Sequence, residues 1–264
     1  MSASDNNDNH NDGKISSGGP KQNIKDSLRP PLPKRFYKEA ERVPCADGSG
    51  FEIRLDGRPL RTPLKRILVI PDEAFADLVL SEWRAQSAVI DPSSMPATRL
   101  ANSAVDTVAD NREAVAAEIV AYAGSDLLCY RASGPATLVA RQNEVWDPIL
   151  QGVEASIAAR FIRAEGVMHV DQPALVFERV AAAIAELPDL QLAALQLVTT
   201  LTGSAVLAIA LAKRMVTADA VWAAAHLDED WQIEQWGPDE DAEVRRAVHE
   251  RDFRAAAAAL DALN

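Results

Sequence analysis

The chain has 264 residues, of which 48% are hydrophobic and 25% are charged. This composition is typical of a globular protein with an ample core, and it excludes a collagen-like chain, a wholly disordered chain and a disulfide scaffold. The net charge of −12 argues against nucleic-acid binding and against an anionic membrane surface, because both require a basic protein surface. Cys45 and Cys129 are far apart in the sequence and are expected to be reduced thiols.

The charge is distributed unevenly along the chain. Residues 1–33 and residues 34–95 each hold equal numbers of acidic and basic residues, whereas residues 96–264 hold 25 acids and 13 bases. This contrast predicts two domains of different kinds that follow a short tail.

The first 33 residues are rich in Asn, Asp, Ser and Gly and predict a disordered tail, because they cannot bury enough apolar surface to order themselves. They contain no apolar stretch of the kind found in signal peptides, and Asp5, Asp8 and Asp12 argue against a mitochondrial transit peptide. The most apolar segment, Leu192–Ala212, is interrupted by polar residues and predicts a core helix. We therefore expect a bacterial cytoplasmic protein without stable membrane insertion.

Residues 34–95 predict a small α+β domain with a short antiparallel sheet. Phe51–Leu55 alternates apolar and polar residues, as a half-buried strand does. The following Asp56-Gly57 dipeptide favours a type I′ hairpin turn. The other expected elements are strands at Phe36-Tyr37, at 58–62 on the sheet edge and at 68–70, and a helix that begins at 71–73.

Residues 96–264 predict a larger all-helical domain, since Ala and Leu dominate and apolar residues recur at helical spacing. Pro188 and Pro238 indicate breaks between helices, and Thr217 is typical of a helix N-terminus. The fold class is therefore α+β, with the small domain first. Helices are expected near 97–109, 111–123, 136–164, 173–186, 190–213, 217–235 and 239–262.

Common catalytic motifs are absent from the sequence. There is no glycine-rich nucleotide loop, no nucleophile elbow and no pair of histidines at metal-binding spacing. Gly203-Ser204 lies in an apolar run, where small residues favour close helix packing over a catalytic role. We expect no cofactor and no metal, and catalysis has no support from the sequence.

Residues 226–243 form the most unusual segment, with eight carboxylates and no Lys or Arg. Trp222, Trp231 and Trp236 lie within or beside it. One interpretation is a solvated acidic face whose indole rings fill the core. The other is a contact surface for a basic or aggregation-prone partner, because Trp beside charge is typical of interface hot spots.

A second unusual segment combines residues 82–86 with residues 95–106. We expect Trp83 to close the small domain against the linker, and Asn102 and Asp106 share one helical face at i, i+4 spacing. Thr98 is a candidate cap for the helix that follows. The segment is interpreted either as a domain junction held by polar contacts or as a binding cleft.

A series of short segments, in chain order over about residues 34–250, resembles a family of assembly chaperones. This family handles the α subunit of the catalytic head of F-type ATP synthase. The resemblance implies a small α+β domain before an all-helical domain, and a non-catalytic function without nucleotide. It implies that the protein binds the free α subunit and shields its subunit interface until the head assembles. The segments are RFYKEA (35–40), LDGRPLRTP (55–63), LVIP (68–71), EWRAQ (82–86), IDPSSMPATRLANSAVD (90–106), YAGSDLLCYRA (122–132), RQNEVWDP (141–148), LTGSAVLAIAL (201–211) and LDEDWQIEQWG (227–237).

The resemblance also implies an important acidic residue at Asp228, where family members often carry Glu, and the sequence leaves open whether Asp228 or Glu229 makes the contact. Trp231 is the expected core member of the segment. The expected partner-facing set is Asp228, Asp230, Gln232, Glu234 and Trp236, and the expected junction residues are Trp83, Asn102 and Asp106.

Two alternatives remain beside a monomeric chaperone for the α subunit. A hydrolase using carboxylates such as Asp228 and Asp230 would require a deep cleft with strongly shifted pKa values. A generic acidic adaptor would bind many basic proteins and lose them at moderate salt.

Overall fold

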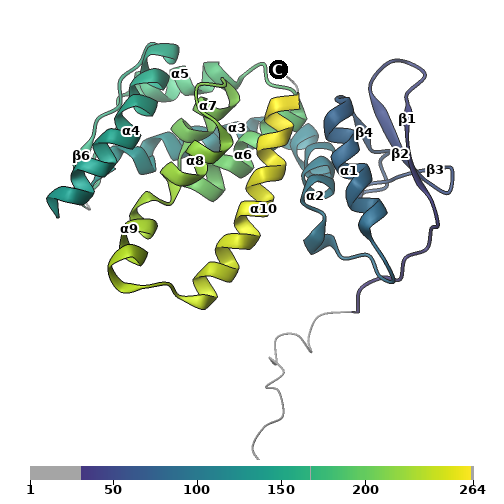
Figure 1. Cartoon of the computed structure of the whole chain (residues 1–264). Helices are drawn as coiled ribbons and strands as arrows, with labels where there is room; N and C mark the ends of the chain where they lie inside the picture. The colour runs from purple at the N-terminus through teal and green to yellow at the C-terminus, as the bar shows by residue number, and fades with distance from the viewer. Residues whose placement is uncertain (1–30, 167, 263–264) are drawn as a thin grey trace, which may run out of the picture.

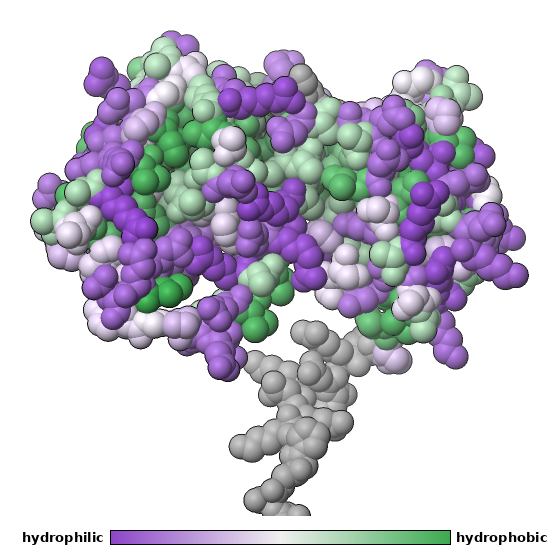
Figure 2. Space-filling view, viewed as in Figure 1, coloured by the Kyte–Doolittle hydropathy of each residue, from purple (hydrophilic) through white to green (hydrophobic). Residues whose placement is uncertain are grey.

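The computed structural model describes residues 31–166 and 168–262. The predicted tail lies almost wholly at residues 1–30, outside the described part. In Figure 1 a small sheet with α1 and α2 occupies one side, a larger body of helices occupies the other, and α10 runs between them. Figure 2, in the same view, shows the surface hollowed where the end of α9 approaches the start of α10.

The chain first forms the sheet and then the helices, and two further short strands, β5 and β6, lie among the helices. The strands and helices are β1 (Ala40–Pro44), β2 (Phe51–Leu55), β3 (Arg58–Pro59), β4 (Val69–Ile70), α1 (Glu73–Ala85), α2 (Pro96–Ser103), α3 (Ala109–Tyr122), β5 (Tyr130–Arg131), α4 (Ala136–Ile157), β6 (Ala164–Glu165), α5 (Ala174–Ile184), α6 (Asp189–Thr202), α7 (Ala205–Ala212), α8 (Ala218–Ala225), α9 (Leu227–Trp236) and α10 (Glu240–Ala262).

The antiparallel sheet is built around β2, which pairs with β1, β3 and β4. Asp56 and Gly57 both have positive φ, at 48° and 77°, so the predicted type I′ turn between β2 and β3 is confirmed. Pro59 lies in β3 at the edge of the sheet, as expected. The small α+β arrangement predicted near the N-terminus is therefore present.

The strand expected at Phe36-Tyr37 is wrong, because the first strand of the sheet begins at Ala40. The Tyr37 ring is instead buried, and its hydroxyl donates a 2.5 Å hydrogen bond to the carbonyl oxygen of Trp83. The aromatic pair thus packs α1 onto the chain before the sheet. α1 itself begins where predicted, since the Asp72 carboxylate caps the N–H of Phe75 over 2.8 Å.

Three predicted helices end earlier than expected or are divided in the structure. The helix expected at 190–213 is divided into α6 and α7 at Gly203, where φ is 66°. The helix expected at 217–235 is divided into α8 and α9 at His226. The helix expected at 136–164 ends at Ile157, because Ala158 is left-handed with φ of 53°. After Ala158 the chain becomes extended, and β6 pairs in parallel with β5. The sequence does not predict this pair of strands.

The segment expected as helices at 97–109 and 111–123 is α2 and α3, joined by a π-helical turn at Ala104–Val108. The predicted breaks at Pro188 and Pro238 are confirmed, and so is Thr217, whose hydroxyl accepts from the N–H of Ala220.

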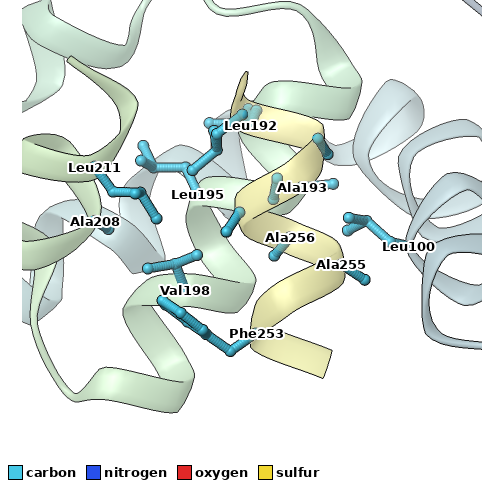
Figure 3. Packing of buried hydrophobic residues seen from close by; sticks show 14 of the residues in the cluster. Leu100, Leu192, Ala193, Leu195, Val198, Ala208, Leu211, Phe253, Ala255 and Ala256 are labelled. Carbon is cyan, nitrogen blue, oxygen red and sulfur yellow. The ribbon is translucent and has the colours of Figure 1, made fainter. Parts of the chain in front are cut away.

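α10 connects the two sides of the molecule through a face of small residues. Figure 3 shows this helix between Leu100 of α2 on one side and Val198 of α6 on the other. Ala255 and Ala256 are buried there, and their small size allows the helices to approach closely. The buried apolar residues form one cluster that extends from the sheet through α10 into the helical body.

Candidate functional site

The acidic segment folds into the short helix α9 and the start of α10. α9 ends at Gly237, where φ is 86°, and Pro238 follows before α10 begins at Glu240. Leu227 is its one fully buried residue. The helix therefore has little core packing of its own, and polar contacts to neighbouring helices must fix its position.

Two contacts attach α9 to α4. The side-chain amide of Gln142 donates a 2.8 Å hydrogen bond to Oδ1 of Asp228. One turn and a half further along, the Arg141 guanidinium contacts both carboxylate oxygens of Glu234 at 2.9 Å. Gln142 is itself buried, and its side-chain oxygen accepts from the N–H of Ala132 beside β5. The two acids thus hold α9 to α4, Asp228 through a buried glutamine and Glu234 through an arginine at the surface.

A third contact joins α9 to α10, where Arg246 and Asp230 form an ion pair. The hydrogen bond that Arg246 donates to Asp230 raises the pKa of the guanidinium, as expected for a paired cation. Three members of the predicted partner-facing set, Asp228, Asp230 and Glu234, are therefore engaged within the molecule. The other two, Gln232 and Trp236, are exposed.

The three tryptophans of the segment have different environments. Trp222 on α8 is buried and packs against Phe253 with ring centroids 5.1 Å apart. Trp231 is half-buried against the core, and Trp236 is 77% exposed. The Trp231 and Trp236 rings meet edge to face at 6.0 Å. The expected core role thus falls on Trp222 in full and on Trp231 in part, while Trp236 projects from the end of α9.

A groove of about 530 Å³ lies between α9 and the first half of α10. Figure 2 shows the hollow on this face of the molecule. The acidic segment is visible in the sequence, but the groove is not, because α10 contributes about half of its wall. The lining residues are Glu229, Gln232, Ile233, Trp236, Gly237, Asp239, Ala242, Glu243, Arg246, Ala247 and Glu250.

The second candidate segment lies where the sheet meets the helices. Trp83 is buried beneath Tyr37 with ring centroids 5.6 Å apart. Asp106 accepts from the Thr62 hydroxyl at 2.7 Å and from the N–H of Leu64 at 3.0 Å. Asn102 is half-buried on α2, and its Oδ1 has no hydrogen-bond partner among the described residues. Trp83 and Asp106 therefore make contacts typical of a structural junction.

The cap at the start of α2 is Glu82, not Thr98. The Glu82 carboxylate accepts from the N–H groups of Ala97 and Thr98 and from the Thr98 hydroxyl, each at 2.7 Å. Burial raises the pKa of this carboxyl, although the three hydrogen bonds oppose the shift. The two parts of this second segment, residues 82–86 and 95–106, are thus joined by one side chain, which connects α1 to α2.

The group with the most strongly shifted carboxyl pKa lies away from both segments. Asp126 is fully buried, which raises its pKa to about 6. Its carboxylate accepts from the Ser204 hydroxyl at 2.7 Å and from the N–H of Val206 at 2.9 Å. Ser204 in turn caps α7 through the N–H of Leu207. The pair lies sealed in the core with no exposed surface and fixes the start of α7.

Cys129 is also buried, which raises the pKa of its thiol to about 12. Within the described ranges, no group of three or more His, Cys, Asp or Glu residues is placed to hold a metal ion. No helix in those ranges combines the length and the apolar character needed to cross a bilayer.

Comparison with known proteins gives a consistent assignment. The family described as ATP12 chaperone protein matches residues 34–154. The mitochondrial protein atp12 of Schizosaccharomyces pombe is 26% identical over 231 residues, which cover 80% of this chain and 78% of that protein.

Two solved structures are similar over most of their length. A putative chaperone from Agrobacterium tumefaciens is 47% identical with a TM-score of 0.84, and the match covers 92% of each chain. Atp12 from Paracoccus denitrificans is 37% identical with a TM-score of 0.80, and the match covers 88% of this chain and 99% of that one. With this identity, this coverage and the shared fold, the chain belongs to the ATP12 chaperone family.

Proposed function

We propose that this protein is a non-catalytic assembly chaperone that binds the free α subunit of F-type ATP synthase. It shields the subunit interface of that protein until the catalytic head assembles. The observation that carries the proposal is Trp236, which is 77% exposed at the end of an acidic helix in a chain of a chaperone family. A large aromatic side chain in this setting suits contact with a partner better than contact with solvent.

The physical need for such a protein follows from the nature of subunit interfaces. A subunit that has not yet met its neighbour exposes an apolar surface that promotes aggregation. A chaperone that covers this surface must bind it selectively and must later yield to the true neighbour. A few aromatic contacts within a charged rim suit this task, because the rim improves encounter and selectivity without making the complex permanent.

We place the partner contact on the surface of α9, with Asp228, Asp230, Gln232, Glu234 and Trp236 as its residues. Gln232 and Trp236 are free to touch the partner directly. The three acids hold the helix in place through Gln142, Arg246 and Arg141, and they give the surface its negative charge. We propose that the protein acts as a monomer in the bacterial cytoplasm.

A hydrolase is the less favoured alternative. The strongly shifted carboxyl group, Asp126, is sealed in the core and has hydrogen-bond donors as partners. Asp228 and Asp230 are each in contact with a side chain from another helix, and they do not face one another across an enclosed cleft. Among the described residues, neither the shifted carboxyl group nor the acidic pair therefore has the setting expected of a hydrolase site.

The test is capture of purified α subunit by the immobilised full chain, with the β subunit as the control, at about 0.1 M and about 0.5 M salt. We expect selective capture of α that persists at the higher salt, because Trp236 adds apolar contact to the charged rim. Equal capture of both subunits, or loss of all capture at the higher salt, would favour the acidic adaptor.

Asp228→Lys should weaken capture, because it reverses the charge and breaks the contact with Gln142 on α4. Glu178→Lys is the matched control, since it makes the same change of charge at an exposed position of α5. Circular dichroism must show that both variants fold. If the two variants bind α equally well, the contact surface does not lie on α9.

A further inference from the structure

The groove between α9 and α10 combines an apolar interior with an acidic rim. Ile233 and Trp236 line it from α9, with exposed fractions of 36% and 77%, and Ala242 and Ala247 line it from α10. Exposed large apolar side chains that converge on a concave surface are typical of a binding groove. The Trp236 ring is also steadied by its edge-to-face contact with Trp231, so less entropy is lost when a partner binds.

The rim of the groove carries an excess of negative charge. Four carboxylate residues and one arginine line it. The arginine, Arg246, is already paired with Asp230, and Glu250 is bound by Arg254. Neither Glu229 nor Glu243 forms a salt bridge among the described residues, although Glu229 also interacts electrostatically with Arg246. These two carboxylates stand on opposite walls of the groove and are available to a basic partner.

The structure also separates two roles within the acidic segment. Asp228 and Glu234 are bound to α4, and Asp230 is bound to α10. Glu229 lies between Asp228 and Asp230 in sequence, yet its side chain is exposed and faces the groove. Asp228, Asp230 and Glu234 fix the position of α9, whereas Glu229 is placed to contact a partner.

We propose that this groove receives a basic amphipathic helix of the client protein. One large apolar side chain of that helix packs against Ile233 and Trp236, and Lys or Arg residues beside it meet Glu229 and Glu243. This is helix-in-groove recognition, in which apolar anchors provide affinity and flanking charges provide selectivity. The identity of the client rests on the proposed function, whereas the chemistry of the bound segment rests on the groove alone.

Charge complementarity distinguishes this occupant from a second copy of the same chain. The protein has a net charge of −12, and the groove itself is acidic, so an approaching copy meets repulsion. A basic helix instead gains favourable encounter from the same field.

The first experiment measures the affinity of the full chain for the purified α subunit of F-type ATP synthase. Trp236→Ala and Glu243→Lys should each weaken binding by at least about tenfold, as loss of an interface hot spot does. Val244→Ala and Glu240→Lys are the matched controls, because both residues are exposed on α10 but do not line the groove. The controls should change the affinity by less than about threefold. Thermal unfolding must be measured for every variant, so that misfolding is not mistaken for lost binding.

The second experiment places a photo-cross-linking amino acid at position 236 and identifies the captured peptide by mass spectrometry. The expected product is a peptide of the α subunit with large apolar residues flanked by Lys or Arg. A cross-link to an acidic peptide, or to a second copy of this chain, would overturn the proposed occupant.

The outcomes separate this inference from the proposed function. If the wild type does not bind the α subunit, the proposed function fails. If the wild type binds it but the groove variants bind as tightly as their controls, the proposed function stands and the groove is not the recognition site.

Discussion

The amide of Gln142 on α4 and the carboxylate of Asp228 on α9 are joined by a 2.8 Å hydrogen bond across 86 positions of sequence. Gln142 is buried and bonds in the other direction to the N–H of Ala132. A buried polar bridge of this kind is costly to break, because each unpaired group then loses both water and its partner. The position of the exposed surface on α9 thus depends on a residue in the core.

Removal of this acceptor should destabilise the protein. Asp228→Ala is expected to lower the free energy of unfolding by about 1–2 kcal/mol, since it leaves the Gln142 amide without its acceptor. Asp228→Asn preserves a side-chain oxygen at the same place and should change the free energy of unfolding by less than about 0.5 kcal/mol. Urea unfolding of both variants tests the contrast, and equal stabilities would mean that the hydrogen bond contributes nothing.

The cap on α2 makes a second prediction. Glu82→Ala deletes an acceptor of three hydrogen bonds and should lower the free energy of unfolding by about 2 kcal/mol. Glu113→Ala, at an exposed position of α3, should change it by less than about 0.5 kcal/mol. Chemical denaturation measures both changes, and a loss no greater than that of the control would exclude a capping role for Glu82.

Asp126 predicts a specific pH dependence of stability. Burial raises its pKa from 3.8 to about 6, so between these values the folded protein keeps a proton that the unfolded chain has lost. The stability contributed by this proton is fully present below about pH 4 and is lost as the pH rises through about 6, by about 3 kcal/mol in all.

The measurement compares the free energy of unfolding of the wild type and of Asp126→Asn across this range of pH. As the pH rises, the free energy of unfolding of the wild type should fall relative to that of Asp126→Asn, because the asparagine does not titrate. Asp241→Asn, at an exposed position, serves as the control. Parallel curves for the wild type and Asp126→Asn would show that Asp126 does not titrate in this range.

The close packing of α10 makes a fourth prediction. Ala256 is fully buried on α10, which packs between α6 and α2, so Ala256→Leu should overpack the joint and cost about 1–3 kcal/mol. Ala247→Leu adds the same atoms at an exposed position of the same helix and should be tolerated. Differential scanning calorimetry measures the shift, and an unchanged melting temperature for Ala256→Leu would show that the joint has free space.

Local signals account for the parts of the fold that the sequence predicts well. The turn at Asp56-Gly57 and the helix start at Thr217 each depend on residues within a few positions. The break between α6 and α7 depends on Gly203 and on the Ser204 cap, which are local, but also on Asp126, which holds Ser204 from 78 positions away. A sequence pattern reports an apolar run at that point but not the distant carboxylate that divides it.

The candidate site shows the same limit. The acidic segment and its exposed Trp236 are visible in the sequence as composition. The distinction between Asp228, which is held by α4, and Glu229, which faces the groove, depends on which helices surround α9. Neighbouring residues on a helix point in different directions, so a one-position difference decides between a structural and an exposed role.

The placement of α10 has a consequence for how the chain is made. Arg99 and Asp252 form an ion pair across 153 positions, and α10 follows in sequence every element against which it packs. Because synthesis proceeds from the N-terminus, the surfaces of α2 and α6 that receive Ala255 and Ala256 leave the ribosome uncovered. Until α10 arrives, the nascent chain exposes an apolar surface that it later buries. A protein proposed to cover the apolar surface of an unassembled subunit thus passes through a stage in which its own apolar surface is uncovered.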